Sequence, residues 1–304
     1  MSVPLPITEL ESGARRSAVI ARLSKLPPFH PAAVKLLTLS ANSDATLADF
    51  ERAFGCDPAL ASDLLVVANS PLYGLRARID NLRHAIVLLG MDTVRSITLT
   101  VALSAYVRSG PARRVVRSVW AHSLATALVA EAIGKAQGEP GPSLYTAGLV
   151  HDVGRLGMLN LEGDRYVGVL EREYYEMEES LLLETLLFGC AHDDAGGFLV
   201  RSWGFPESIC DCVRFHHQSG GDHGPALRVV QSACRYAAAL GFGELSSADR
   251  PPAHIDVLPP ALRGTASLEP ERMQKRIAQA EAEFGGLIAL PSPATDSAFL
   301  YKTS

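Results

Sequence analysis

The amino-acid sequence predicts an all-α protein, and three observations support this fold class. Apolar residues recur at helical spacing in segments such as "PAAVKLLTL" and "ALRVVQSACRYAAAL". Capping residues and Gly or Pro stops bound these segments, while the alternating pattern of strands is scarce. With 304 residues, of which 47% are hydrophobic and 20% charged, the chain can bury one large core or two smaller ones.

The first hundred residues predict a bundle of short, capped helices. Thr46 is expected to cap the second helix, Asp57 the third, and Asp92 opens the fifth. The stretch "ANSPLYGL" predicts a turn that serves as a helix connector or as an interaction loop. The predicted helices cover residues 31–39, 47–54, 58–69, 79–90 and 92–107.

The rest of the chain predicts longer helices. A helix over about 111–137 contains Trp120 and His122, and "AQGEPGP" ends it. A single helix is expected over "SLYTAGLVHDVGRLGMLNL". A proline-rich loop at 249–264 precedes a final amphipathic helix, "EPERMQKRIAQAEAEFGGLIAL". The second part therefore also predicts a helical unit, longer than the first.

Composition narrows the setting in which the protein works. The N-terminus lacks the basic start and apolar core of a signal peptide, and the longest apolar runs are too short to span a bilayer. None of the five cysteines forms a C-x-x-C pair, so nothing favours an oxidising compartment or a cysteine-only zinc site. We therefore expect a cytoplasmic protein without a membrane partner.

One basic stretch stands out in a chain of net charge −5. Between Arg76 and Arg117 there are eight arginines, opposed only by Asp80 and Asp92. Such a stretch is compatible with nucleic acid, an anionic nucleotide or an acidic partner. Because aromatic residues do not alternate with these arginines, a solvated helical face is the preferred interpretation, and nucleic acid is not the expected partner.

Histidines gather in the second part of the chain. His122, His151 and His192 lie on separate predicted helices, each among small or apolar residues, and Asp152 directly follows His151. Imidazoles with one carboxylate suit iron, manganese or zinc, and Asp152 could bridge two ions. Hydrogen-bonded core histidines are the alternative, and we prefer that interpretation for the isolated residues His30, His84, His223 and His254.

Several motifs together resemble the HD-related output domain, or HDOD, family of bacterial regulatory modules. The motifs are "LPPFHPAAVKLLTLS", "DPALASDLLVVANSPLYGL", "NLRHAIVLLGMDTVRSITL", "HSLATA", "AGLVHDVGRLGML", "HDDAGGFLVRSWGFPESI" and "RFHHQ". The resemblance runs from about Leu26 to Leu240 and implies two packed helical sub-domains. The expected units are an N-terminal extension, the N-terminal helical bundle, an HD-like helical domain and a C-terminal loop with its helix, at residues 1–18, 19–108, 109–245 and 246–304.

The family is related to HD and HD-GYP phosphohydrolases, and this resemblance implies a set of metal ligands. The chain has a matching side chain at six positions: His122, His151, Asp152, His192, His216 and His217. The implied cofactor is one or two divalent transition-metal ions, with iron, manganese and zinc as candidates.

The chain also departs from those enzymes. Cys234 stands where they place a final Asp ligand, which shifts the metal preference toward softer ions. Arg155 replaces the usual Lys, Gln218 replaces a Glu after the double His, and Ser118 replaces a Glu found in some relatives. If the chain were active, Asp152 and Arg155 would be the expected catalytic residues. The departures favour lost chemistry.

Three functions remain open at this stage. The preferred one is a non-catalytic signalling module that binds a signalling protein or a small nucleotide on a scaffold able to hold metal. The second is a metal-dependent phosphohydrolase acting on a nucleotide, such as a cyclic dinucleotide, whose activity Asp152→Ala would abolish. The third, a nucleic-acid-binding regulator, would lose affinity with salt and with replacement of Arg113 and Arg114.

Overall fold

In the residues that the computed structural model of the chain describes, all regular secondary structure is helical. The described residues are 9–40, 46–54, 57–75, 77–108, 114–139, 141–171, 177–218, 224–243 and 257–288. Within these ranges there is no strand, so the predicted all-α class is confirmed. None of the described helices is long and apolar enough to cross a membrane.

The first part of the chain folds into short helices. They are α1 (Glu9–Leu23), α2 (Pro31–Ser40), α3 (Leu47–Phe54), α4 (Pro58–Ala68), the 3-10 turn η1 (Pro71–Tyr73), α5 (Leu82–Leu89) and α6 (Met91–Arg108). Asp57 caps α4 as predicted, because its carboxylate accepts a 2.9 Å hydrogen bond from the Leu60 amide. The structure also shows α1, a helix that the sequence analysis did not predict.

The second part contains the longer helices. They are α7 (Arg114–Gln137), α8 (Gly141–Val150), α9 (Val153–Glu162), α10 (Asp164–Leu170), α11 (Met177–Phe188), α12 (His192–Ser202), α13 (Glu207–Phe215), α14 (Gly224–Ala239) and α15 (Pro270–Ile288), with 3-10 turns η3 (Pro260–Leu262) and η4 (Ala266–Leu268) before α15. α7 is buried on nearly all sides between Val119 and Ile133. It therefore forms the centre of this half.

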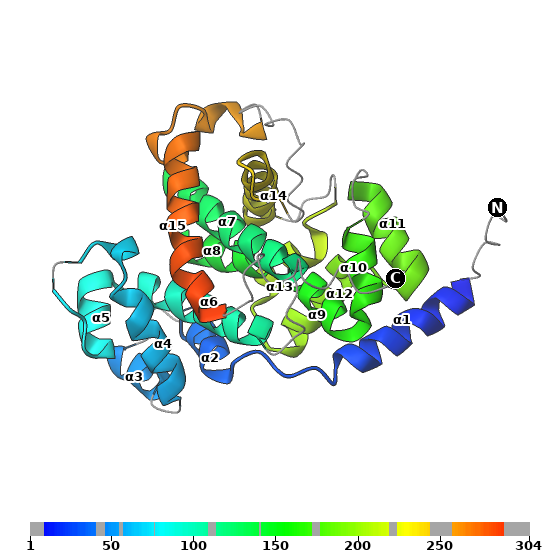
Figure 1. Cartoon of the computed structure of the whole chain (residues 1–304), viewed down its shortest axis with the longest axis horizontal. Coiled ribbons are helices and arrows are strands. Elements are labelled where there is room, and N and C mark those ends of the chain that lie inside the picture. The colour runs from blue at the N-terminus through cyan, green and yellow to red at the C-terminus, as the bar shows by residue number, and fades with distance from the viewer. Residues whose placement is uncertain are drawn as a thin grey trace, which may run out of the picture.

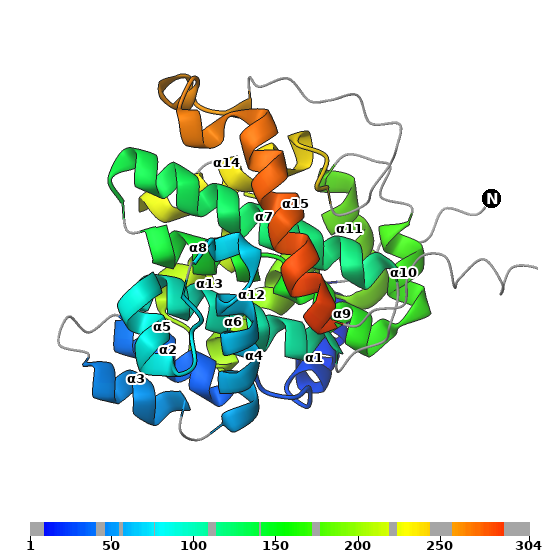
Figure 2. The ribbon, with the colours of Figure 1, turned by 60° about the vertical axis from the view of Figure 1, so that its left-hand side comes forward.

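Helices α2–α5 gather towards one end of the molecule and α9–α12 towards the other, with α7, α8 and α14 between them (Figure 1). α6 joins the first end to the middle, because it packs on α2, α4 and α5 and also on α8. α15 crosses the same boundary and contacts α4, α6 and α7 (Figure 2). α1 does not join the other short helices of the first part of the chain and packs instead against α9, α11 and α12. The limits of the four expected units stay a prediction.

α15 is held by an apolar stripe and by two ion pairs with α7, Arg276 with Glu131 and Glu281 with Arg117. Met273, Ile277, Ala280 and Phe284 recur at three- or four-residue spacing and are all buried. At its edge, the Arg276 guanidinium donates a 2.6 Å hydrogen bond to Glu131 of α7. The final predicted helix is thus confirmed, and it fastens the C-terminal part of the chain to the core.

Glu131→Gln is expected to reduce the acid sensitivity of the fold. Burial would raise the pKa of Glu131, but Arg276 and Lys135 outweigh it and lower that pKa. The carboxylate therefore stabilises the fold above its unfolded-state pKa and loses that contribution as the pH falls through the lower folded-state value. Urea unfolding should show a loss of about 1 kcal/mol at pH 7. The difference should begin to shrink as the pH falls below about 4.5 and should disappear only below the lower folded-state pKa of Glu131. An equal loss with Glu139→Gln, at an exposed position, would contradict this.

Candidate metal centre

The His151–Asp152 pair lies in a two-residue turn between α8 and α9. The predicted single helix over "SLYTAGLVHDVGRLGMLNL" is therefore wrong at its centre. Asp152 has φ −102° and ψ 15°, a sparsely populated backbone region in which many active-site residues lie. The break frees both side chains from the regular 100° rotation of a helix, and both are completely buried.

Close backbone packing brings this turn to α12. A Cβ added at Gly154 would lie 1.8 Å from the carbonyl oxygen of His192 and 2.6 Å from the amide nitrogen of Gly196. Only glycine allows this approach of α9 to α12. As a result, the Asp152 Oδ1 atom lies 3.3 Å from His192 Nε2.

Four histidines are oriented in the same way around Asp152. Each directs its Nδ1 atom to an acceptor. His122, His151 and His216 contact the carbonyl oxygens of Phe242, Gly148 and Val213, and His192 contacts Glu184, at 2.7–2.8 Å. An Nδ1–H that donates to an acceptor leaves Nε2 with its lone pair, which is the usual state of a metal-ligating imidazole.

The potential ligands form two groups. The histidine group consists of Asp152, His192, His216 and His217, and the cysteine group consists of His122, His151 and Cys234. Within each group, one potential ligand atom per residue lies within 4.8 Å of all the others.

Asp152 faces both groups. Its Oδ1 atom lies 3.3 Å from the Nε2 atoms of His192 and His216, whereas Oδ2 lies 3.6 Å from His151 Nε2 and 3.9 Å from His122 Nε2. Neither carboxylate oxygen has a hydrogen-bond partner, and neither do the Nε2 atoms of His151 and His216. Unpaired polar atoms are costly at such depth, and a divalent cation would satisfy them. The donor set therefore fits one or two transition-metal ions.

Glu184 of α11 supports this centre, although the sequence analysis missed it. One carboxylate oxygen, Oε2, accepts from the His192 amide at 2.7 Å and contacts His192 Nδ1 at 2.8 Å. The other, Oε1, accepts a 2.6 Å hydrogen bond from the Tyr166 hydroxyl. Its signal in the sequence is a single carboxylate in the apolar run "LLLETLLF". Glu184 thereby fixes the ring of His192.

Arg155 lies between the two carboxylates and is completely buried. Its Nε atom is 3.5 Å from Asp152 Oδ1, and its Nη1 atom is 3.5 Å from Glu184 Oε1. Burial would raise the pKa of Asp152, but His151 and Arg155 outweigh it and hold that pKa well below its usual range. The guanidinium therefore serves as an internal counter-ion for both acids.

The imidazoles differ in their affinity for protons. Burial lowers the pKa of His151 to about 3 and also lowers those of His122 and His217. Burial and Arg155 would also lower the pKa of His192. Glu184 and Asp152 outweigh them and raise that pKa to about 10. Without metal, His192 thus carries a proton on both ring nitrogens, and its Nε2–H donates to His217 Nε2, at 2.8 Å. A metal ion bound by these two nitrogens would displace the Nε2 proton.

The structure thus brings together all six predicted ligands and Cys234. The isolated histidines lie elsewhere: His30 and His84 are half-buried and contact Asp57 and Asp80 at 2.7 and 3.2 Å, while His223 and His254 are outside the described residues. Arg76 and Arg113 of the basic stretch also fall outside the described part. Three of the other arginines pair with carboxylates: Arg83 with Glu51, Arg95 with Asp92 and Arg117 with Glu281.

Known proteins share this fold. A solved HDOD domain protein of unknown function from Geobacter sulfurreducens has a TM-score of 0.69 at 24% identity, over 96% of this chain and 99% of its own. A candidate phosphohydrolase from Shewanella amazonensis has a TM-score of 0.65 at 19% identity, over 90% of this chain and 98% of its own. A candidate signal transduction protein from Marinobacter aquaeolei has a TM-score of 0.64 at 20% identity, over 92% of this chain and 65% of its own.

Sequence comparison agrees with the structural likeness. An uncharacterized protein of Treponema pallidum is 24% identical over 220 residues, or 71% of this chain, and the chain spans 42% of that relative's length. The family model of the HDOD domain matches residues 26–219, which is more than half of the chain. The resemblance found in the motifs is therefore confirmed, and the chain belongs to the HDOD domain family.

Proposed function

We propose that this protein is a non-catalytic signal-transduction module that holds divalent metal in its buried centre and acts by binding a signalling protein. The family and the signal-transduction name of the Marinobacter aquaeolei protein support a regulatory role. None of the cysteines that the structure describes forms a disulfide, which agrees with work in the reducing cytoplasm of a bacterium.

The observation that carries this proposal is the position of Arg155. Its guanidinium is shielded from solvent and paired with Asp152 and Glu184, so it compensates internal charge instead of presenting a cation to a phosphate. Cys234 also stands where the resemblance to HD phosphohydrolases implies a carboxylate that could orient water. Six ligand positions thus match the resemblance, while two groups suited to hydrolysis, at Arg155 and Cys234, differ from it.

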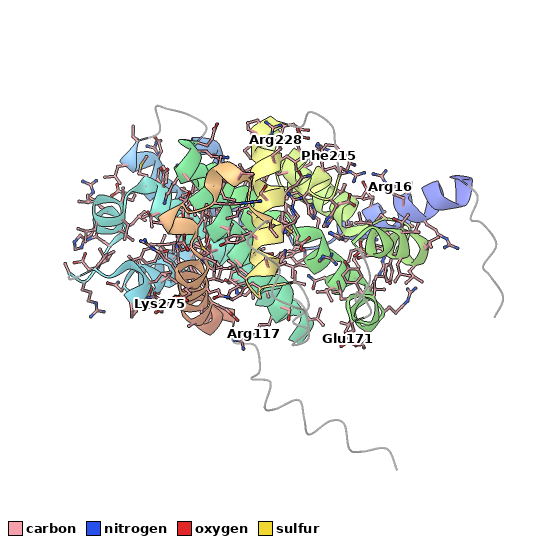
Figure 3. The ribbon with its side chains drawn as sticks, turned by 90° about the horizontal axis from the view of Figure 1, so that it is seen from above. Arg16, Arg117, Glu171, Phe215, Arg228 and Lys275 are labelled. Atoms are coloured by element: carbon pink, nitrogen blue, oxygen red, sulfur yellow. The ribbon has the colours of Figure 1, made fainter. Side chains whose placement is uncertain are left out.

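The centre can connect distant helices. A bound ion supplies a fixed positive charge, and its ligands come from α7, the α8–α9 turn, α12, the end of α13 and α14. Two residues after His192, Asp194 accepts hydrogen bonds from Arg16 of α1 at 2.5 and 2.8 Å. Figure 3 shows Arg16 where α1 meets the second half. The occupancy of the centre would therefore affect a surface helix available to a partner.

A metal-dependent phosphohydrolase acting on a nucleotide, such as a cyclic dinucleotide, is the second candidate. The observation that favours it is the Asp152 carboxylate, which faces the histidine group with one oxygen and the cysteine group with the other. A carboxylate shared by two ions is typical of paired metal sites that activate water and clamp phosphate.

Metal analysis combined with a hydrolysis assay tests the proposal. Protein purified without chelators should contain metal, and Asp152→Ala should lose it, because the shared ligand is gone. Neither protein should hydrolyse a cyclic dinucleotide or a simple phosphodiester. Asp211→Ala, on α13 outside both groups, is the control and should keep its metal.

Two results would overturn the proposal. Metal-dependent hydrolysis that Asp152→Ala abolishes would establish the phosphohydrolase instead. Wild-type protein without metal, even after incubation with zinc, iron and manganese salts, would leave a binding module that does not use this centre.

A further inference from the structure

We propose that the cysteine group is a zinc site with thiolate ligation, formed by His122, His151, Cys234 and the Oδ2 atom of Asp152. This inference rests on the proposed function, since it requires a centre that holds metal. The inference adds that the cysteine group and the histidine group differ in the metal ion they prefer. The cysteine group would select a soft ion, and the histidine group would bind through nitrogen and oxygen alone.

The spacing of the ligand atoms supports a tetrahedral ion. Cys234 Sγ lies 3.5 Å from His122 Nε2. Zinc bonds of about 2.3 Å to sulfur and about 2.0–2.1 Å to nitrogen, at tetrahedral angles, hold the two atoms about 3.5 Å apart. The 3.6 Å between Asp152 Oδ2 and His151 Nε2 is close to the roughly 3.4 Å expected for oxygen and nitrogen ligands. Small side-chain adjustments would complete the coordination.

The unpaired atoms of this half point to a cation. His151 and Asp152 are completely buried, and neither His151 Nε2 nor Asp152 Oδ2 has a hydrogen-bond partner. His122 and His151 are held by their Nδ1 contacts to the carbonyl oxygens of Phe242 and Gly148, so their Nε2 atoms face inward. One ion between these atoms would satisfy both histidines and the carboxylate together.

Cys234 differs from the other described cysteines in its surroundings. Cys190, Cys210 and Cys212 belong to neither ligand group. Burial raises the pKa of Cys210 to about 11 and that of Cys212 to about 12, so these remain thiols. Cys234 instead faces two imidazoles. A thiolate there carries the charge of the carboxylate it replaces but prefers zinc to magnesium or manganese.

Cobalt substitution tests this assignment. The chain of 304 residues is stripped of metal with a chelator and titrated with Co²⁺, a spectroscopic substitute for Zn²⁺. Visible d–d bands report that the centre binds the ion, and a near-ultraviolet sulfur-to-cobalt charge-transfer band reports thiolate ligation. We expect both signals in the wild type. Added Zn²⁺ should displace Co²⁺ from the thiolate site, and the charge-transfer band should then disappear.

Variants separate the ligand from the fold. Cys234→Ser should lose the charge-transfer band and keep d–d bands from the histidine group. Cys234→Asp should also lose that band while binding Mn²⁺ roughly tenfold more tightly, within the range of changes in a ligand shell. Cys210→Ser removes another buried cysteine, whose Sγ contacts the Phe205 carbonyl oxygen, and should retain both signals.

The results distinguish the two proposals. Wild-type d–d bands without a charge-transfer band would overturn thiolate ligation and leave the metal-holding module intact. A charge-transfer band that persists in Cys234→Ser would overturn the assignment to Cys234. No cobalt signal of either kind would overturn the metal-holding function itself, and the thiolate site with it.

Discussion

Glu184→Ala is expected to lower the free energy of unfolding by about 3–5 kcal/mol, the range measured when one partner of a buried ion pair is removed. The carboxylate accepts from the Tyr166 hydroxyl and the His192 amide and lies 3.5 Å from Arg155. Its removal would leave the Arg155 guanidinium, which is completely buried, with less compensating charge. Urea unfolding of the metal-free protein at pH 7 measures the loss.

The neighbouring residue provides the control for this prediction. Thr185→Ala removes only a hydroxyl that donates to the Leu181 carbonyl oxygen within α11, and should change stability by no more than about 0.5–1 kcal/mol. Glu184→Gln keeps the size of the side chain but not its charge, and should weaken metal binding about 10–100-fold by loosening His192. If Glu184→Ala cost no more than Thr185→Ala, the buried network would not support the fold.

Gly154→Ala should have the second large effect, a loss of about 3 kcal/mol or more, at the upper end of overpacking penalties. The added Cβ would lie 1.8 Å from the His192 carbonyl oxygen, which belongs to the backbone and cannot rotate away. α9 and α12 must therefore separate, which moves His192 from Asp152. Thermal unfolding measures the stability change, and metal analysis of the purified variant measures the damage to the centre.

Gly168→Ala is the matched control within α10. A Cβ at Gly168 would meet no atom within 4 Å, so alanine should be neutral or stabilise the helix by up to about 1 kcal/mol. Equal stability of the two variants, with metal retained in Gly154→Ala, would show that the contact between α9 and α12 is not needed for the centre.

The sequence predicted most of the helices because helices depend on local patterns, whereas the six metal ligands were implied by the family resemblance and stay a prediction. Helical spacing and caps are visible in short windows, as Asp57 shows. The break at His151–Asp152 was missed because "GLVHDVGRL" contains no proline and no strong helix-breaking cluster. The close approach of α12 to Gly154 accompanies this break, and contacts between helices distant in sequence are not visible in a local pattern.

The environment of the charged residues could not be predicted for a similar reason. Glu184 stands alone in an apolar run, where a carboxylate usually faces solvent, and its partners Tyr166 and His192 come from other helices. For Arg155, the resemblance to HD phosphohydrolases implied a cation near the centre. Only the packing of α11 shows that this cation lies inside the protein, against Glu184.

The packing of α15 on α6 and α7 has a consequence for folding during synthesis. α6 and α7 leave the ribosome long before α15, yet Met273, Ile277 and Phe284 of α15 form part of their core. Apolar surface on α6 and α7 must therefore stay exposed to solvent in the nascent chain until residues near 284 emerge. A fragment limited to residues 26–219 would stay in that state permanently and would also lack Cys234. The synthesis of α15 thus determines when the core of the protein can be completed.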